Sequence, residues 1–264
     1  MRFIALIAAL LCAILHLALA APFTELRRQR AADRAARRSS PLIPAKGADP
    51  NARSRTSSNW GGAILKGEGV VSVTGEFTVP VPKPGTNTAG KDSSATVWVG
   101  IDGDESCPGA LLQTGVDMMI SKLDFVTYIA WFEWFPQPPS TFDNMVIVAG
   151  DKVTMTITTD GTSSGSATII NQSNGYRSTI VFFGEPDLCL TTAEWIVEDY
   201  EQGDGSMVPF ANFGSVAITN TYAQVGSQYV GVKDAQVIDI RQNNKDLTSC
   251  SLPDDYTVNC QYIG

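Results

Sequence analysis

The sequence predicts an all-β protein folded as a sandwich or a barrel, and three observations support this class. Short runs of alternating apolar and polar residues recur about every 8–12 residues from Ser57 onward, separated by Gly, Pro, Asn or Asp turns. The composition, with 23 Gly and 14 Pro in 264 residues, favours short strands and turns over helices. After Ser57 no 11-residue window shows a helical period, so no amphipathic helix is expected there.

Residues 1–20 have the features of a secretory signal peptide. Arg2 supplies the positive start, residues 4–19 form the apolar run, and Ala18-Leu19-Ala20 is a small-residue cleavage site. The run is too short and wrongly flanked for a spanning helix. We therefore expect a secreted, extracellular protein with no membrane segment after processing.

Residues 21–55 are predicted to be a basic propeptide that is removed near Arg55. Residues 1–55 carry ten basic and three acidic residues, whereas the rest of the chain carries nine basic and 24 acidic residues. The basic N-terminal region and the remaining chain, whose net charge is −15, should attract each other. This attraction suggests that the propeptide covers the folded domain electrostatically, and that its binding weakens when acid neutralises the carboxylates of the domain. A basic linker without an inhibitory role is the alternative. A body this acidic is a poor binder of nucleic acid.

Residues 56–264 show the same alternating pattern throughout, with no internal repeat and no change in composition, which predicts a single domain. The alternating runs expected as strands are VVSVTGEFTVP (70–80), SATVWVG (94–100), DKVTMTITT (151–159), GSATIIN (165–171), RSTIVFF (177–183), AEWIVEDY (193–200), GSVAITNTY (214–222) and DAQVIDI (234–240).

The stretch 95–136 is predicted to form three strands that carry polar side chains on one face. Side chains two residues apart in a strand share a face. The three sets that share a face are Trp98, Gly100 and Asp102; Leu111, Gln113, Gly115 and Asp117; and Trp131, Glu133 and Phe135. If the strands pair, they make a sheet face of carboxylates, a carboxamide and indoles, as in a binding cleft. A solvated outer face is the alternative.

The cysteines predict two disulfides. Cys12 lies in the predicted signal, and the other four form an even set in a chain expected to be exported. Cys250 and Cys260 flank a short hairpin-like stretch and are the expected local pair, which leaves Cys107 with Cys189.

Histidine is nearly absent, and this limits the possible chemistry. The single histidine, His16, lies in the predicted signal. The mature chain therefore lacks the means for Ser-His-Asp or Cys-His catalysis and for histidine-ligated zinc. No Asp-Thr-Gly or Asp-Ser-Gly of an aspartic protease occurs either. Any chemistry is expected to use carboxylates, amides, hydroxyls, lysine or tyrosine, and we expect no metal or other cofactor.

The run 193–200 offers a second set of acids. Its alternation places Glu194, Ile196, Glu198 and Tyr200 on one face. A carboxylate in a strand beside bulky apolar residues is partly desolvated, so its pKa should rise and make it a usable general base in weak acid. An ordinary acid on an edge strand is the alternative.

Five motifs in this order resemble the eqolisins, the glutamic peptidases. They are SNWGGAIL (58–65), WVGIDGD (98–104), LQTGVD (112–117), WFEWFP (131–136) and AEWIVED (193–199). The resemblance implies a secreted acid endopeptidase on a β-sandwich of two large antiparallel sheets, of the concanavalin A-like lectin/glucanase type. It also implies insensitivity to pepstatin.

The resemblance places the catalytic glutamine and glutamate of the family on Gln113 and Glu198. Glu198 would take a proton from the attacking water and pass it to the leaving nitrogen, and Gln113 would stabilise the oxyanion. Asp117 and Glu133 are assigned to hydrogen bonds that orient this pair or the water. The residues expected to support the site or bind substrate are Trp60, Trp98, Asp102, Asp117, Trp131, Glu133 and Phe135.

The chain departs from the family pattern in two places. The usual Trp-Tyr-Glu-Trp-Tyr is Trp-Phe-Glu-Trp-Phe here, so two phenolic hydroxyls are lost. The loop after the catalytic glutamate, residues 201–206, lacks the cysteine that some members carry there.

A secreted glycoside hydrolase using two carboxylates and a non-catalytic carbohydrate-binding module are the rival functions. The expected partners are protein or peptide substrates and the chain's own propeptide, and we expect a monomer. Asn171 begins the single sequon noted, in an expected surface turn, and is a candidate for glycosylation.

Overall fold

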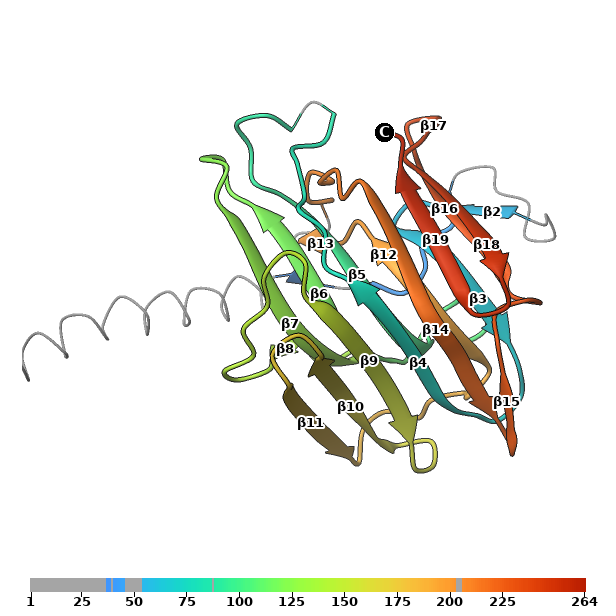
Figure 1. Cartoon of the computed structure of the whole chain (residues 1–264). Helices are drawn as coiled ribbons and strands as arrows, with labels where there is room; N and C mark the ends of the chain where they lie inside the picture. The colour runs from blue at the N-terminus through green and yellow to red at the C-terminus, as the bar shows by residue number, and fades with distance from the viewer. Residues whose placement is uncertain (1–36, 39, 46–53, 87, 203–205) are drawn as a thin grey trace, which may run out of the picture.

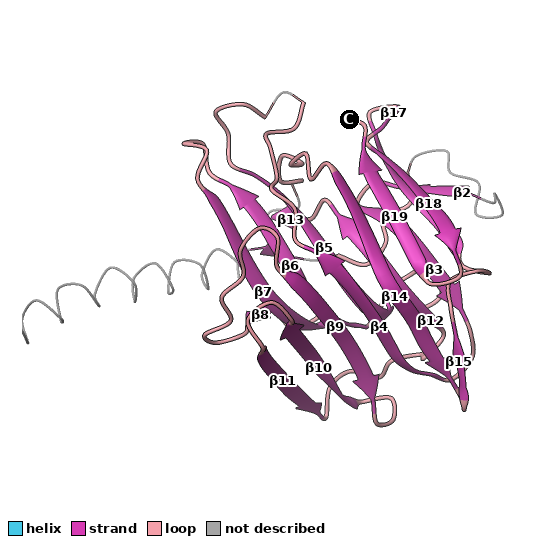
Figure 2. Cartoon of the chain, viewed as in Figure 1, coloured by secondary structure: helices cyan, strands magenta, loops and turns pink. Residues whose placement is uncertain are grey.

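Two large sheets packed face to face form the protein. The computed structural model describes residues 37–38, 40–45, 54–86, 88–202 and 206–264, in which there are 19 strands and no helix (Figures 1 and 2). The fold is therefore an all-β sandwich, as predicted. Within those residues no helix is long and apolar enough to cross a membrane.

The nine-stranded sheet has the order β17-β16-β3-β12-β5-β6-β7-β8, and β2 pairs in parallel with β16. Its strands are β2 (Ser54–Ser57), β3 (Trp60–Lys66), β5 (Ser93–Asp102), β6 (Leu111–Ile120), β7 (Val126–Phe135), β8 (Ser140–Thr141), β12 (Thr192–Glu198), β16 (Gln236–Gln242) and β17 (Lys245–Asp246).

The eight-stranded sheet has the order β11-β10-β9-β4-β14-β19-β18, and β15 pairs with β14. Its strands are β4 (Val70–Thr78), β9 (Lys152–Thr159), β10 (Ser164–Asn171), β11 (Tyr176–Phe183), β14 (Ser215–Val225), β15 (Gln228–Val230), β18 (Thr248–Asp254) and β19 (Thr257–Tyr262). A separate pair joins β1 (Arg37–Arg38) to β13 (Glu201–Gln202).

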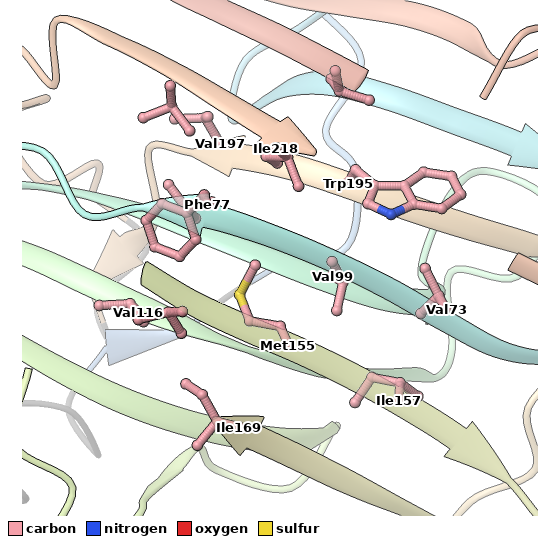
Figure 3. Close-up of a cluster of buried hydrophobic side chains, with 14 of the residues drawn as sticks. Val73, Phe77, Val99, Val116, Met155, Ile157, Ile169, Trp195, Val197 and Ile218 are labelled. Atoms are coloured by element: carbon pink, nitrogen blue, oxygen red, sulfur yellow. The ribbon is translucent and has the colours of Figure 1, made fainter. Parts of the chain in front are cut away.

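The main core lies between the two sheets. Figure 3 shows Val99, Val116, Trp195 and Val197 of the nine-stranded sheet packed with Val73, Phe77, Met155, Ile157, Ile169 and Ile218 of the eight-stranded sheet. Strand β10 shows the alternation expected when one face is packed and the other is partly exposed. Strands β5 and β12, in contrast, are buried along their whole length, so the outer face of the nine-stranded sheet is covered as well.

The strand predictions from the sequence agree with the structure. Each predicted run overlaps a strand, and the stretch 95–136 forms the adjacent strands β5, β6 and β7. The two predicted disulfides, Cys107–Cys189 and Cys250–Cys260, are both present. The first joins the loop after β5 to the loop before β12.

Arg55 is an exception to the predicted domain boundary. It lies in β2, paired with Ile238 of β16, and only 4% of its surface is exposed. Its guanidinium makes an ion pair with Glu105 at 2.7 Å and donates to Gln236 at 3.3 Å. A removal site next to Arg55 would cut a strand of the folded sheet, so Arg55 is a structural residue rather than part of an exposed linker. Most of the predicted propeptide, and the predicted signal peptide, lie outside the described residues.

Candidate active site

The pairing of five strands arranges the outer face of the nine-stranded sheet in rows. One row contains Trp60, Glu198, Thr96 and Asp117, and another contains Ile64, Glu194, Gly100, Gln113 and Glu133. Side chains in these rows point to the same face, opposite the main core. Gln113 and Glu198 thus share a face, two strands apart and four residues out of line. In a flat sheet this separates their backbones by about 10 Å across the strands and about 13 Å along them.

Glu198 is the last residue of β12, and its carboxylate is held by an indole. Trp98 Nε1 donates a hydrogen bond to Glu198 Oε2 at 2.7 Å, and the backbone N–H of Ser40 donates to Oε1 at 3.3 Å. The side chain is fully buried. Charge-assisted bonds of this kind fix the orientation of a carboxylate. Trp98 therefore fixes the orientation of the Glu198 carboxylate beside β5.

Gln113 lies in the middle of β6, and its amide is oriented by an acid on β7. Gln113 Nε2 donates to Glu133 Oε2 at 2.8 Å, between residues directly paired in the two strands. A carboxamide nitrogen carries two hydrogens, so one of them is available for a second acceptor. Gln113 Oε1 is buried and has no hydrogen-bond partner in the described part of the chain. The arrangement presents Gln113 as a fixed donor.

The Trp98 side chain lies between the rows of Glu198 and Gln113 on this face, and Gly100 and Gly115 leave the space that its indole occupies. A Cβ added at Gly100 would lie 2.8 Å from Trp98 Cζ3, and one at Gly115 would lie 2.6 Å from Trp98 Cβ. Trp60 packs edge-on against Trp98 with ring centroids 4.8 Å apart. An indole and two glycines thus occupy the face between Glu198 and Gln113.

The other predicted site residues take different positions. Asp117 is buried in the row of Glu198, separated from it by Thr96. Trp131 Nε1 donates to Thr96 Oγ1 at 3.1 Å, so this indole also belongs to the face. Phe135, at the end of β7, is partly exposed and packs against the apolar cluster of this face.

Asp102 anchors a loop rather than the catalytic face. It lies at the end of β5 with a positive φ of 69°, and its carboxylate accepts hydrogen bonds from the backbone N–H groups of Leu190, Thr191 and Thr192 at 2.8, 2.9 and 3.3 Å. By register it is level with Leu111, beyond the row of Gln113. Its contacts indicate that Asp102 holds the disulfide-linked loop in place.

The same loop contains a group of potential metal ligands that cannot act as one. Asp102, Cys107 and Cys189 bring ligand atoms within 4.8 Å of one another. The two sulfurs are joined in a disulfide, and the carboxylate is occupied by backbone amides. Neither sulfur is a thiolate, which is the form that binds zinc.

Asn171 corrects a prediction made from the sequence. The sequon was expected in a surface turn, but Asn171 is the last residue of β10 and its side chain is buried. Its Nδ2 donates to Val146 O at 3.1 Å and to Asp151 Oδ2 at 2.7 Å. The folded protein therefore does not present this amide for glycosylation. The pattern Asn-X-Ser identifies the sequon but carries no information about this burial.

Residues 40–45 lie over the candidate site, a feature that the sequence did not predict. Ser40 contacts Glu198 through its N–H, and its carbonyl oxygen accepts from Trp60 Nε1 at 3.1 Å and from Asn59 Nδ2 at 3.3 Å. Its hydroxyl donates to Glu201 at 2.9 Å. Neither Asn59 nor Glu201 was singled out from the sequence, although Asn59 stands inside the first family motif.

Two further acids close to the site are buried in unusual surroundings. Burial raises the pKa of Glu194 well above its usual range, the carboxylates of Asp102 and Asp104 raise it further, and the Thr192 hydroxyl lowers it. Burial likewise raises the pKa of Asp199, against a hydrogen bond from Gln242 that lowers it. Neither Glu194 oxygen makes a hydrogen bond of normal geometry in the described residues. Both groups therefore favour the protonated form.

We expect the folded protein to lose stability as the pH rises from about 4 toward neutrality. In the folded state Glu194 and Asp199 bind their protons more tightly than in the unfolded chain. Their stabilising contribution is complete below the unfolded pKa and is lost as the pH rises through the folded pKa, at up to about 1.4 kcal/mol per pH unit for each group. Urea denaturation at a series of pH values measures this slope.

A Glu194→Gln variant provides the control for this prediction. The substitution keeps the shape and removes the proton equilibrium, so the slope should become smaller. An unchanged slope in this variant would assign the pH dependence to other groups.

The comparisons with known proteins agree with the motifs. A family model described as the Peptidase A4 family matches residues 58–262. The chain belongs to the Peptidase A4 family. Aspergillopepsin-2 of Aspergillus niger is 42% identical over 273 residues, covering 93% of this chain and 95% of that protein. Scytalidopepsin B of Scytalidium lignicola is 39% identical over 222 residues, covering 81% of each.

Solved structures of the Peptidase A4 family confirm the fold. Scytalido-glutamic peptidase with a transition state analog inhibitor matches with a TM-score of 0.70 and 38% identity, over 78% of this chain and 98% of that one. Aspergilloglutamic peptidase from Aspergillus niger matches with a TM-score of 0.61 and 44% identity, over 65% and 99%. This is the eqolisin family that the motifs resemble, and the protein is a glutamic-type endopeptidase.

Proposed function

We propose that the protein is a secreted acid endopeptidase in which Glu198 and Gln113 catalyse direct attack of water on a peptide bond. The observation that carries the proposal is the placement of the two side chains on one face, each oriented by its own partner. Trp98 holds the carboxylate and Glu133 holds the carboxamide. A peptide lying across Trp98 would be reached by Glu198 from one side and by Gln113 from the other.

In the first step the ionised Glu198 takes a proton from water as the water oxygen attacks the carbonyl carbon. The carbonyl oxygen becomes an oxyanion, and the free N–H of Gln113 donates to it. A carboxamide suits this role in acid because it donates at any pH, whereas a carboxylic acid donates only while it is protonated. One such donor contributes about 2.7–4 kcal/mol to the stability of a transition state.

In the second step the tetrahedral intermediate collapses and the carbon–nitrogen bond breaks. Glu198 passes the proton that it took from water to the leaving nitrogen, so the amine departs neutral and the carboxylate is restored. The step needs no cofactor. Glu198 thus acts first as a base and then as an acid, which requires it to stay within reach of both water and nitrogen.

We also propose that residues 40–45 belong to a propeptide that keeps the enzyme latent. The N–H of Ser40 takes the place beside Glu198 Oε1 where the attacking water would be held. Glu198 and Gln113 are both fully buried while the segment is present. The apolar run at residues 1–20 supports secretion, and Arg55 supports a removal site upstream of β2.

Cleavage of a denatured protein tests the proposed function. The full chain, produced by secretion, is incubated with denatured globin at pH about 3 and at pH about 7, with pepstatin present. Peptide release in acid alone is the expected result, because the folded protein loses the stabilising contribution of Glu194 and Asp199 as the pH rises, and because acid weakens the attraction between the basic N-terminal region and the acidic domain.

A parallel incubation with a panel of polysaccharides covers the rival functions. Sugar release without proteolysis would identify a glycoside hydrolase, and binding without release would identify a carbohydrate-binding module. Either outcome would overturn the proposal.

A further inference from the structure

The 40–45 segment is hydrogen-bonded to the rest of the protein along its whole length, beginning at Glu198. All of its backbone N–H groups are bonded, since Pro41 and Pro44 have none. The donors and acceptors are Ser40 N to Glu198 Oε1 at 3.3 Å, Leu42 N to Gly103 O at 2.9 Å, Ile43 N to Asn59 Oδ1 at 2.9 Å and Ala45 N to Thr56 O at 3.1 Å. This pattern uses main-chain groups, so peptides of other sequence could bind in the same way.

Leu42 is the member of this segment that enters the face. Its side chain is 7% exposed and belongs to a buried apolar cluster separate from the main core. The other buried members of the cluster are Trp60, Ile64, Trp98, Leu111, Trp131, Ile196 and Ile238. Two of them, Trp60 and Trp98, are the indoles beside Glu198. The apolar cluster is thus continuous with the candidate catalytic site.

The neighbouring side chains of the segment are bound less deeply. Ile43 is half-buried and Pro44 is exposed. Leu42 and Ile43 have the same size, so their difference in burial comes from the direction in which they point and not from their chemistry. This pair of residues separates recognition by the apolar cluster from general contact with the segment.

We propose that the apolar cluster around Leu42 is a substrate subsite that selects a bulky aliphatic side chain. Leu42 occupies this subsite as a substrate mimic, two residues after the amide that faces Glu198. The inference rests on the proposed function of this site. It adds that Leu42, rather than the charge of the Arg-rich head, is the anchor that keeps the segment in place.

The composition of the cluster determines the ligand class. Its members are indoles and branched aliphatic side chains, so a charged side chain in place of Leu42 would lose its hydration without gaining a partner. Burying a leucine side chain instead contributes enough to change binding by roughly 10- to 100-fold.

The first test compares Leu42→Ala with Ile43→Ala in the full chain at neutral pH. Hydrogen exchange of the amides in 40–45 should become about 10- to 100-fold faster in Leu42→Ala, and at most about threefold faster in Ile43→Ala. This readout does not depend on catalysis. Equal exchange in the two variants would overturn the role of Leu42 as the anchor.

The second test uses the acid-activated enzyme and the blocked peptide acetyl-Ser-Pro-Leu-Ile-Pro-Ala-amide as a competitive inhibitor. Replacing Leu by Ala or Asp should weaken inhibition by about 10-fold or more, whereas replacing Ile by Ala should change it little. A peptide that loses nothing on the Leu replacement would overturn the subsite. An enzyme that cleaves no protein at all, with hydrogen exchange as predicted, would overturn the proposed function alone.

Discussion

Glu198→Gln is expected to reduce kcat/KM for a peptide substrate by about 10⁴-fold, with little change in KM. The variant keeps the size of the side chain and its contact with Trp98. It cannot take a proton from water, and it cannot return one to the leaving nitrogen. Because Glu198 has both roles in the proposed mechanism, its loss should approach the upper end of the range known for general acid–base catalysis.

Glu194→Gln is the matched control for this variant. Glu194 is also a fully buried glutamate on the same face of β12, four residues before Glu198. Burial raises its pKa and favours the protonated form, and within the described residues neither of its carboxyl oxygens makes a hydrogen bond to Gln113 or Glu198. Near wild-type activity in acid is expected for Glu194→Gln. Equal losses in the two variants would indicate that burial of a carboxyl, and not base catalysis, explains the effect.

Gln113→Ala is expected to reduce kcat by about 10²–10³-fold, which corresponds to the loss of one donor to the oxyanion. The contribution is specific to the transition state, so KM should change little. Gln113→Glu keeps the size and shape of the side chain but replaces the amide donor by a carboxyl group. It should retain activity only at pH values low enough to protonate the new carboxyl, which would make its pH profile narrower than that of the wild type.

Folding of the Gln113 variants is checked by near-ultraviolet circular dichroism. The removal of Gln113 also removes the buried hydrogen bond that it donates to Glu133, so a modest fall in thermal stability is expected. A Gln113→Glu variant with the wild-type pH profile would contradict the role of Gln113 as a donor.

The strands were predictable because their chemistry is local. The alternation in 95–136 and 193–200 reflects packing against one core face, and the sharing of a face follows from the period of a strand. The number of disulfides followed from the even set of cysteines in a chain expected to be exported, and their pairing followed from the short hairpin-like stretch between Cys250 and Cys260. The motifs supplied the identity of the catalytic pair, which alternation alone could not.

The order in which the strands pair within each sheet was not predictable from these local patterns. β12 lies between β3 and β5, which end 126 and 90 residues before it begins, and this insertion is what brings Glu198 beside Trp98. Asp102 shares the strand face of Trp98 by alternation, but its position at the strand end makes it a loop anchor. A pattern of period two does not say where a strand ends.

Contacts made by the N-terminal region were also missed. The segment Ser-Pro-Leu-Ile-Pro-Ala has the composition of a linker, and Arg53 and Arg55 resemble a processing signal. The structure places Leu42 in an apolar cluster and Arg55 in a strand with an ion pair to Glu105. Such contacts depend on surfaces formed by distant parts of the chain, which a local pattern does not contain.

The central claim is that one carboxylate and one carboxamide act on the same peptide bond. The most direct measurement is kcat and KM of the acid-activated wild type, Glu198→Gln, Gln113→Ala and Glu194→Gln on one peptide, side by side. We predict that kcat falls by orders of magnitude in the first two variants and stays close to the wild-type value in the third, with KM nearly constant throughout. Substantial kcat in folded Glu198→Gln or in folded Gln113→Ala would contradict the account.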